Sequence, residues 1–191
     1  ALNLSEIGTS VREVRRQTED IRNSQYSPPL SPTLEDSPAI AISRVSHSYS
    51  EKSALNKVNA VINHGEIVAI MGRNGAGKST LLHSIVGLHS PHSGEIRVNG
   101  ADPTLLKGAA RRRAIGYVPQ EPSDLLFASS VEEECVLADR NNEIAPGSTA
   151  ALLNRLVPHI SLHAHPNDLS EGQRLALVLS IVLSGNPDVL V

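Results

Sequence analysis

A run of residues near the middle of the chain has the types and spacing needed to hold phosphate groups. From Gly72 to Thr80 it reads Gly-Arg-Asn-Gly-Ala-Gly-Lys-Ser-Thr, which fits the pattern G-x-x-x-x-G-K-[ST]. Gly75 and Gly77 allow backbone angles and a close approach that a side chain would block. The backbone N–H groups then point inward, and a helix beginning at Lys78 adds the positive end of its dipole. We therefore expect a phosphate site in which Lys78 neutralises the β- and γ-phosphates of a nucleotide and Ser79 binds Mg²⁺.

The elements around this loop indicate an α/β fold. A continuous buried strand is predicted directly before the loop, at Ile67 to Met71, and a helix after it, at Lys78 to Leu88. The further predicted strands are marked by Ile40, Ile42 and Val45, by Val58 to Ile62, by Glu95 to Asn99, by Ala114 to Val118 and by Val189 to Val191. Residues 121–168 look mainly helical, and a strong helix is predicted from Glu171 to Leu183. Strand, glycine loop, helix and later buried strands imply a sheet with a helical insertion.

Composition narrows the class of protein. The 191 residues carry a formal net charge of −3, so no overall positive field attracts nucleic acid, and Arg111 to Arg113 are expected to form a solvated edge. Cys135 is the only cysteine, which excludes an internal disulfide framework and suits a reducing compartment. The longest strongly apolar stretch, Leu175 to Leu183, is short of the ~20 residues that a membrane-spanning helix needs.

The amino-terminal part of the chain differs from the rest. Residues 1–23 have one apolar stripe at helical spacing, which predicts a helix. We interpret this helix as the possible tail of a preceding domain. Residues 24–38 are rich in proline and serine and predict a semi-extended linker. The domain proper is expected over 39–191, with a helical subdomain at about 121–170. The chain begins at Ala1 and ends at Val191 in an apolar run, so both ends look cut.

Three further stretches resemble the ATP-binding-cassette (ABC) family. Leu169-Ser-Glu-Gly-Gln173 looks like its signature motif, with Glu171 where the family usually has glycine. Gln120, after a predicted strand, looks like the glutamine of the family's Q-loop, and Tyr49 stands where the family places an aromatic that stacks on adenine. An ordinary serine helix cap and a tyrosine packed on the sheet are the alternatives at Ser170 and Tyr49.

The resemblance implies a fold, a cofactor set and a site. The fold would be a P-loop NTPase of ABC type, with a parallel core sheet, an antiparallel β subdomain and a helical subdomain, truncated at its C-terminal end. ATP and Mg²⁺ would be the cofactors, with Ser79 and Gln120 at the metal and Gln120 and Lys78 as the catalytic residues. The implied nucleotide-binding residues are Tyr49, Gly72, Asn74, Gly75, Ala76, Gly77, Lys78, Ser79 and Thr80, joined by Ser170, Gly172 and Gln173, which would close over ATP bound by a second ABC domain.

The segment from Gln120 to Glu134 resembles one branch of the family, the energy-coupling-factor and cobalt-type importers. Phe127, the only phenylalanine, stands beside Leu126 in a largely polar stretch, where it could line a groove for a coupling helix of a transmembrane component. A role in the core of the helical subdomain is the alternative. Some transporters of this branch carry two ATPase domains in tandem, which would account for residues 1–38.

These resemblances imply an ATPase domain of an importer of a small solute, a vitamin or metal ion, attached to the cytoplasmic face of the membrane through its partner. The family's catalytic glutamate would follow Val191, so we expect no hydrolysis from the chain as given. A soluble ABC ATPase acting on ribosomes or DNA is the main alternative. A plain P-loop kinase or GTPase does not explain the signature.

Overall fold

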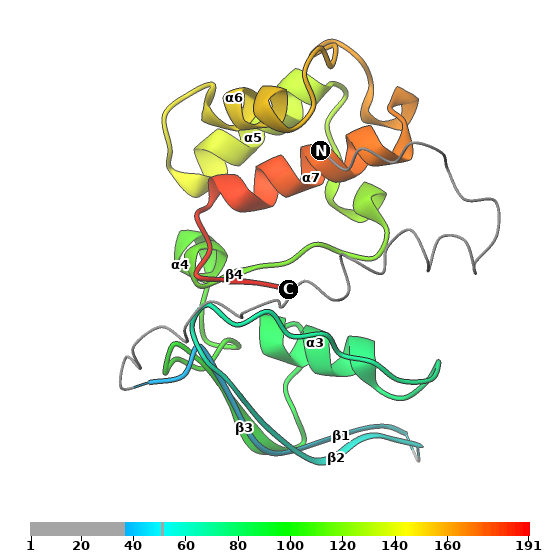
Figure 1. Cartoon of the computed structure of the whole chain (residues 1–191), viewed down its shortest axis with the longest axis vertical. Coiled ribbons are helices and arrows are strands. Elements are labelled where there is room, and N and C mark those ends of the chain that lie inside the picture. Colours follow the sequence, from blue (N-terminus) through cyan, green and yellow to red (C-terminus); the bar gives the residue numbers. More distant parts are fainter. Residues whose placement is uncertain (1–36, 51) are drawn as a thin grey trace, which may run out of the picture. The chain divides into compact units, whose positions relative to one another are not determined.

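The computed structural model describes residues 37–50 and 52–191. The predicted helix at 1–23 and almost all of the predicted linker at 24–38 lie outside these residues. The described elements follow one another as β1 (Ile40–Tyr49), β2 (Lys52–Ile62), α3 (Lys78–Val86), β3 (Ser93–Val98), α4 (Gly108–Ala114), β4 (Ile115–Gly116), the 3-10 helix η1 (Pro122–Leu125), α5 (Val131–Asn142), α6 (Ser148–Leu156), the 3-10 helix η2 (Pro166–Asp168), α7 (Glu171–Ser184) and β5 (Val189–Leu190). The mixture of strands and helices confirms the predicted α/β class (Figure 1).

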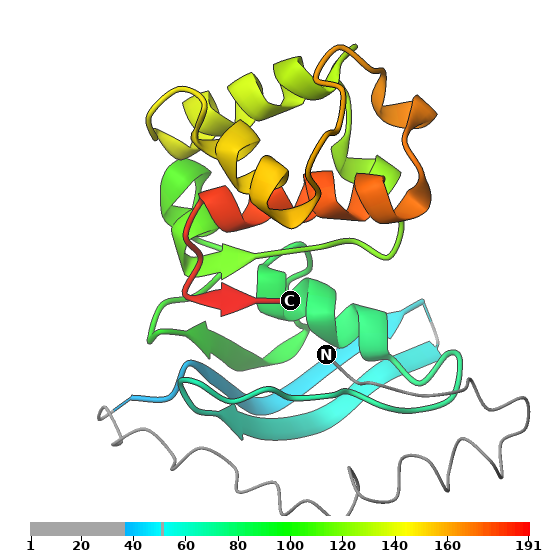
Figure 2. The same ribbon diagram turned by 45° about the horizontal axis from the view of Figure 1, so that its top comes forward.

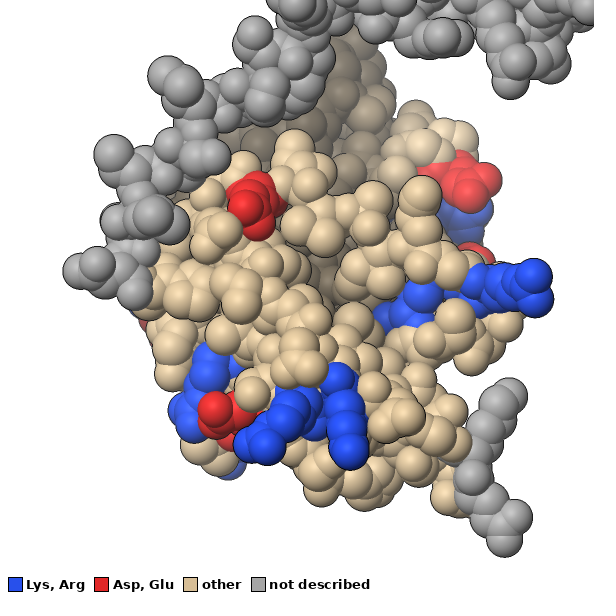
Figure 3. All heavy atoms as spheres, turned by 60° about the horizontal axis from the view of Figure 1, so that its bottom comes forward, with Lys and Arg blue, Asp and Glu red and all other residues tan. Residues whose placement is uncertain are grey.

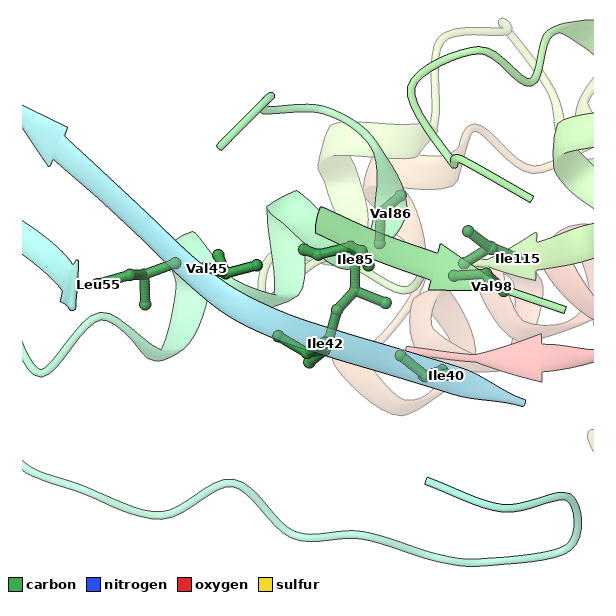
Figure 4. Packing of buried hydrophobic residues seen from close by; sticks show 9 residues of the cluster. Ile40, Ile42, Val45, Leu55, Ile85, Val86, Val98 and Ile115 are labelled. Atoms are coloured by element: carbon green, nitrogen blue, oxygen red, sulfur yellow. The ribbon is translucent and has the colours of Figure 1, made fainter. Parts of the chain in front are cut away.

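The first three strands form an antiparallel sheet with the order β2-β1-β3. Alternate residues of β1, including Ile40 and Ile42, are buried on one face of the sheet, as expected of a strand covered on one side. Ile85 and Val86 of α3 belong to the same buried cluster, as Figure 4 shows. This packing fixes α3 against the antiparallel sheet, and the glycine loop enters α3 at its first turn.

β4 and β5 form a short parallel pair, in which Ile115 lies opposite Val189 and Gly116 opposite Leu190. The pairing continues beyond the strand ends, because the Val118 N–H donates to the Val191 carbonyl at 2.8 Å. Ile115 is buried in the cluster that holds α3 and the antiparallel sheet. One buried cluster therefore contains side chains of the antiparallel sheet, of α3 and of the parallel pair.

The prediction of a buried strand at Ile67 to Met71 is wrong in this structure. The segment is irregular, Ile67 is fully exposed and Met71 is 82% exposed. Within 37–50 and 52–191, no backbone hydrogen bond joins residues 67–71 to another strand, and the sheet that contains β5 has only β4 as its other described strand. An apolar run becomes a buried strand only when neighbouring strands satisfy its N–H and C=O groups and cover its side chains.

The helices α5, α6 and α7 lie together beside the parallel pair (Figure 2). Their apolar faces share a second buried cluster, made of Val131, Cys135, Leu153, Leu169, Ala176 and Leu177. α5 is capped by Ser130, whose hydroxyl accepts a hydrogen bond from the Glu133 N–H at 3.2 Å. Among the described residues no helix is both long and apolar enough to cross a bilayer.

Two of the three arginines of α4 do not form the solvated edge expected of them. Arg111 donates to the Val86 carbonyl at the end of α3 at 2.7 Å, and Arg112 donates to the Asn142 side chain at 2.7 Å. Asn142, itself buried, donates in turn to Ser184 of α7 at 2.8 Å. Arg111 and Arg112 therefore connect α4 to α3 and to α5. On the face drawn in Figure 3, Lys and Arg side chains form separate groups rather than one continuous basic surface.

Candidate functional site

The glycine loop between residues 72 and 77 turns tightly into α3. Gly75 and Gly77 both have positive φ, at 81° and 90°, in the left-handed region that favours glycine. A Cβ on Gly77 would collide with the Ala54 carbonyl of β2, whereas a Cβ on Gly75 would meet nothing within 4 Å. The Leu81 N–H donates to the Gly77 carbonyl at 2.9 Å, which begins the helix. Glycine at 77 is therefore required by the approach of the loop to β2.

The Lys78 side chain folds back over its own loop. Its Nζ donates to the carbonyl of Gly72 at 2.8 Å and to that of Arg73 at 3.1 Å. These contacts hold an ammonium group at the turn that precedes the helix, where a bound anion would also meet the helix N-terminus.

A cavity of about 680 Å³ opens beside this loop. Its walls come from four parts of the chain, the end of β1, the start of β2, the loop with α3, and the segment after β4. The lining residues are Tyr49, Ser53, Ala54, Asn74, Gly75, Gly77, Lys78, Ser79, Thr80 and Gln120. None of these described lining residues is acidic, so they do not repel a polyphosphate. Gly72 and Ala76 belong to the loop without lining the cavity.

Tyr49 and Gln120 are far apart in the sequence, and the fold brings both to this cavity. The Tyr49 ring packs against His47 of β1 at a centroid distance of 4.9 Å, and the residue is still 49% exposed, so part of its surface stays open. Ser53 and Ala54 were not predicted from the sequence. The hairpin places them there, because the β1–β2 pairing sets Ser48 opposite Ser53 and Tyr49 opposite Lys52. No residue type or spacing in the sequence points to these two positions.

The predicted signature residues lie at the start of α7 and do not line the cavity. Ser170 caps this helix in a reciprocal box, in which its hydroxyl accepts from the Gln173 N–H at 3.3 Å and the Gln173 side chain accepts from the Ser170 N–H at 3.0 Å. Ser170, Glu171 and Gly172 are exposed. A Cβ on Gly172 would meet nothing within 4 Å, so no described residue of this chain requires glycine there.

Phe127, seven residues after Gln120 in the sequence, is 83% exposed. Its neighbour Leu126 packs partly against the cluster shared by α5, α6 and α7. The alternative of a core role therefore fits Leu126 and does not fit Phe127.

The chain is similar to known proteins in sequence and in fold. The sequence model of the family described as ABC transporter matches residues 55–191. The chain belongs to the ABC transporter family. A putative ABC transporter ATP-binding protein of Streptomyces coelicolor is 51% identical over 137 residues, covering 72% of this chain and 24% of the relative. A second one, from Clostridium acetobutylicum, is 37% identical over 158 residues, covering 80% of this chain and 57% of the relative.

Solved ABC structures share the fold. CbiO1 from Clostridium perfringens, part of the ABC transporter complex cbiONQ, superposes with a TM-score of 0.68 at 28% identity, over 81% of this chain and 64% of that one. A dimeric ATP-binding cassette bound to ADP and Pi gives the same TM-score and identity, over 79% of this chain and 72% of that one. These matches confirm the P-loop NTPase fold of ABC type. The chain spans about a quarter of the length of the Streptomyces relatives. Members of this family bind ATP with Mg²⁺.

Proposed function

We propose that this ABC chain binds Mg-ATP in the cavity beside the glycine loop and serves as an ATPase domain of an importer for a small solute. The observation that carries the proposal is the cavity itself, in which Tyr49, the glycine loop and Gln120 meet from separate parts of the chain. Its dimensions and the absence of acidic residues among its described lining residues suit a nucleotide.

Seven of the ten lining residues have a physical task in this proposal. The half-exposed Tyr49 ring offers a flat face for adenine. Lys78 exchanges its loop carbonyls for the β- and γ-phosphates, and Asn74, Gly75 and Gly77 let the loop approach them closely. Ser79 and Gln120 supply oxygen atoms suited to Mg²⁺, which when bound neutralises phosphate charge. Ser79 is exposed and lines the cavity next to Lys78 in the chain, which fits such a role.

A second ABC domain is the proposed partner at the start of α7. Ser170, Gly172 and Gln173 are placed at an exposed helix N-terminus, which favours a phosphate of an opposing ATP. The open space at Gly172 is consistent with close approach by another molecule. Glu171, exposed beside them, adds a negative charge that would weaken this closure.

The proposed second partner is a transmembrane component, which would place the domain on the cytoplasmic face of the membrane. Phe127 supports it, because the structure leaves this apolar ring exposed on the segment that starts at Gln120. Truncating a hot-spot residue that is buried at the centre of an interface costs about 2 kcal/mol or more of binding free energy.

Nucleotide binding is tested by Lys78→Ala, with Lys107→Ala as the matched control. Both variants lose one positive charge, but Lys107 is exposed before α4 and does not line the cavity. Loss of hydrogen bonds to a charged phosphate costs about 1.5–3 kcal/mol, so Lys78→Ala should weaken Mg-ATP binding about 10- to 100-fold in calorimetry. Equal affinities in the two variants would reject the assignment of Lys78.

The composite site is tested by Ser170→Arg in the full-length protein, with Ser161→Arg as the control at another exposed serine. We expect Ser170→Arg to block ATP hydrolysis while Mg-ATP binding at Lys78 remains. If Ser170→Arg released phosphate at the wild-type rate, the signature residues would not be part of a composite ATP site.

The membrane partner is tested by Phe127→Ser alone, since Leu126 packs on the core. Leu105→Ser is the matched control, because Leu105 is 75% exposed elsewhere. We expect Phe127→Ser to lose co-purification with the transmembrane component at an unchanged melting temperature. Full association of this variant would favour a soluble ABC ATPase instead.

A further inference from the structure

The three glutamates at the start of α5 have different surroundings. Glu132 and Glu133 are exposed, whereas Glu134 is only 5% exposed. One carboxylate oxygen of Glu134, Oε1, accepts hydrogen bonds from the backbone N–H groups of Phe127 and Ala128, the second at 2.6 Å. Glu133 instead reaches Ser129 from the exposed side, accepting from its N–H at 3.1 Å and from its hydroxyl at 2.7 Å.

Burial of a carboxylate is costly unless hydrogen bonds satisfy it. Bonds from two backbone N–H groups to one charged oxygen are stronger than neutral bonds and fix the direction of both peptide groups. A negative first turn of a helix would be equally favourable with all three glutamates in solvent. The burial of Glu134 therefore has a local purpose, which is to hold the loop at Phe127 and Ala128.

The two neighbouring apolar residues of this loop, Leu126 and Phe127, differ in their burial. Leu126 packs inward on the cluster that contains Val131 and Leu169, and Phe127 points away from it with 83% of its surface exposed. An exposed phenylalanine in a free loop could fold back onto neighbouring apolar surface. Two bonds at its own N–H and the next one oppose that rearrangement.

We propose that Glu134 is the positioning residue that presents Phe127 to its partner, by fastening the Phe127 loop to α5. The inference rests on the proposed role of Phe127 as a contact for the transmembrane component. The segment is also joined to α7, where Arg174 donates to the Ser123 side chain at 3.4 Å, and it begins at Gln120 in the nucleotide cavity. These contacts connect the segment that holds Phe127 to α7, at whose start the signature residues lie, and to the cavity.

The fastening is tested without any partner by hydrogen exchange at single amides of the isolated chain. The Phe127 and Ala128 amides should exchange slowly for a loop and at least about 10-fold faster in Glu134→Ala. Glu133→Ala is the matched control, because it should speed exchange at Ser129 and leave the other two amides slow. Glu134→Gln, which keeps an acceptor oxygen without the charge, should lie between wild type and Glu134→Ala. Exchange at Phe127 and Ala128 that is equally fast in wild type and Glu134→Gln would overturn the fastening, even if the alanine variant failed to fold.

The consequence for the partner is tested in the full-length protein. Glu134→Ala should lower the affinity for the transmembrane component about 10-fold, with Mg-ATP affinity unchanged, and Glu134→Gln should recover part of the loss. If Phe127→Ser leaves association intact, the proposed contact fails, while the exchange result still decides whether Glu134 fastens the loop. If Phe127→Ser abolishes association and neither Glu134 variant changes it, the positioning role is wrong and the contact stands.

Discussion

The segment that leads into the glycine loop and the bundle of α5, α6 and α7 are both rich in apolar residues, yet the fold treats them differently. In the first, Ile67 is fully exposed and Met71 is 82% exposed. In the second, Leu153 and Leu177 are at most 1% exposed. The two regions share their apolar character and differ in what their backbones require.

A helix satisfies its backbone hydrogen bonds within its own sequence, so it needs neighbours only for its apolar face. α5, α6 and α7 find these neighbours in one another, within about fifty residues of chain. A strand must find partners for both its backbone and its side chains. Residues 67–71 lack them in this structure: the segment is not part of a strand, and Ile67 and Met71 are exposed. Apolar pattern alone therefore predicts burial more safely for a helix than for a strand.

The largest effect expected from this difference concerns stability. Leu177→Ala removes a fully buried side chain and should lower the free energy of unfolding by about 2–5 kcal/mol. Ile67→Ala truncates an exposed side chain and should change it by no more than about 0.5 kcal/mol. Denaturant unfolding of both variants measures the two values. A large loss in Ile67→Ala would show that residues 67–71 are buried in solution, and would restore the strand predicted there.

A smaller effect is expected within the glycine loop, where two glycines with similar φ differ in their surroundings. Gly77→Ala combines the left-handed strain with a collision at the Ala54 carbonyl, and should cost about 2–3 kcal/mol and displace the loop from β2. Gly75→Ala has only the strain and should cost about 1 kcal/mol. Melting temperature and Mg-ATP affinity of the pair give the comparison. Similar losses would mean that the loop does not lie against β2 as described.

The smallest effect concerns the closed interior of the helical bundle. Burial, with a further contribution from Asp139, raises the pKa of Cys135 to about 11 from an ordinary value of 9.0. The native thiol should therefore react slowly with an alkylating reagent at pH 8, and rapidly once the chain is unfolded. Fast native reaction would contradict the buried position of Cys135.

The same shift links folding to pH. In the unfolded chain the thiol loses its proton near pH 9, while in the folded chain it keeps it until about pH 11. Its contribution to stability is complete below pH 9 and is lost as the pH rises towards 11. Unfolding free energies at pH 8 and pH 10 should fall more in wild type than in Cys135→Ala. If the free energy of unfolding fell equally in wild type and Cys135→Ala, titratable groups other than the Cys135 thiol would be responsible for the loss.

Much of the candidate site could be predicted from local sequence. Gly77, Lys78 and Ser79 specify a loop and a helix start through their own conformational limits and donors, and the structure places all three at the cavity. Ser170 and Gln173 likewise predict a helix start by reciprocal capping, which the structure shows. These features involve residues close in sequence, so local backbone conformation and local hydrogen bonds are sufficient to determine them.

Other features depended on contacts between distant residues. The sequence alone did not reveal that Ser53 and Ala54 line the cavity, that Arg111 and Arg112 bind α3 and α5, or that Phe127 is exposed while Leu126 is partly buried. The sequence by itself determined the glycine loop, the helix starts and the family to which they belong. Only the tertiary structure decided which apolar and charged side chains are covered, because burial is set by the elements that meet across the fold, and residue type alone does not contain that information.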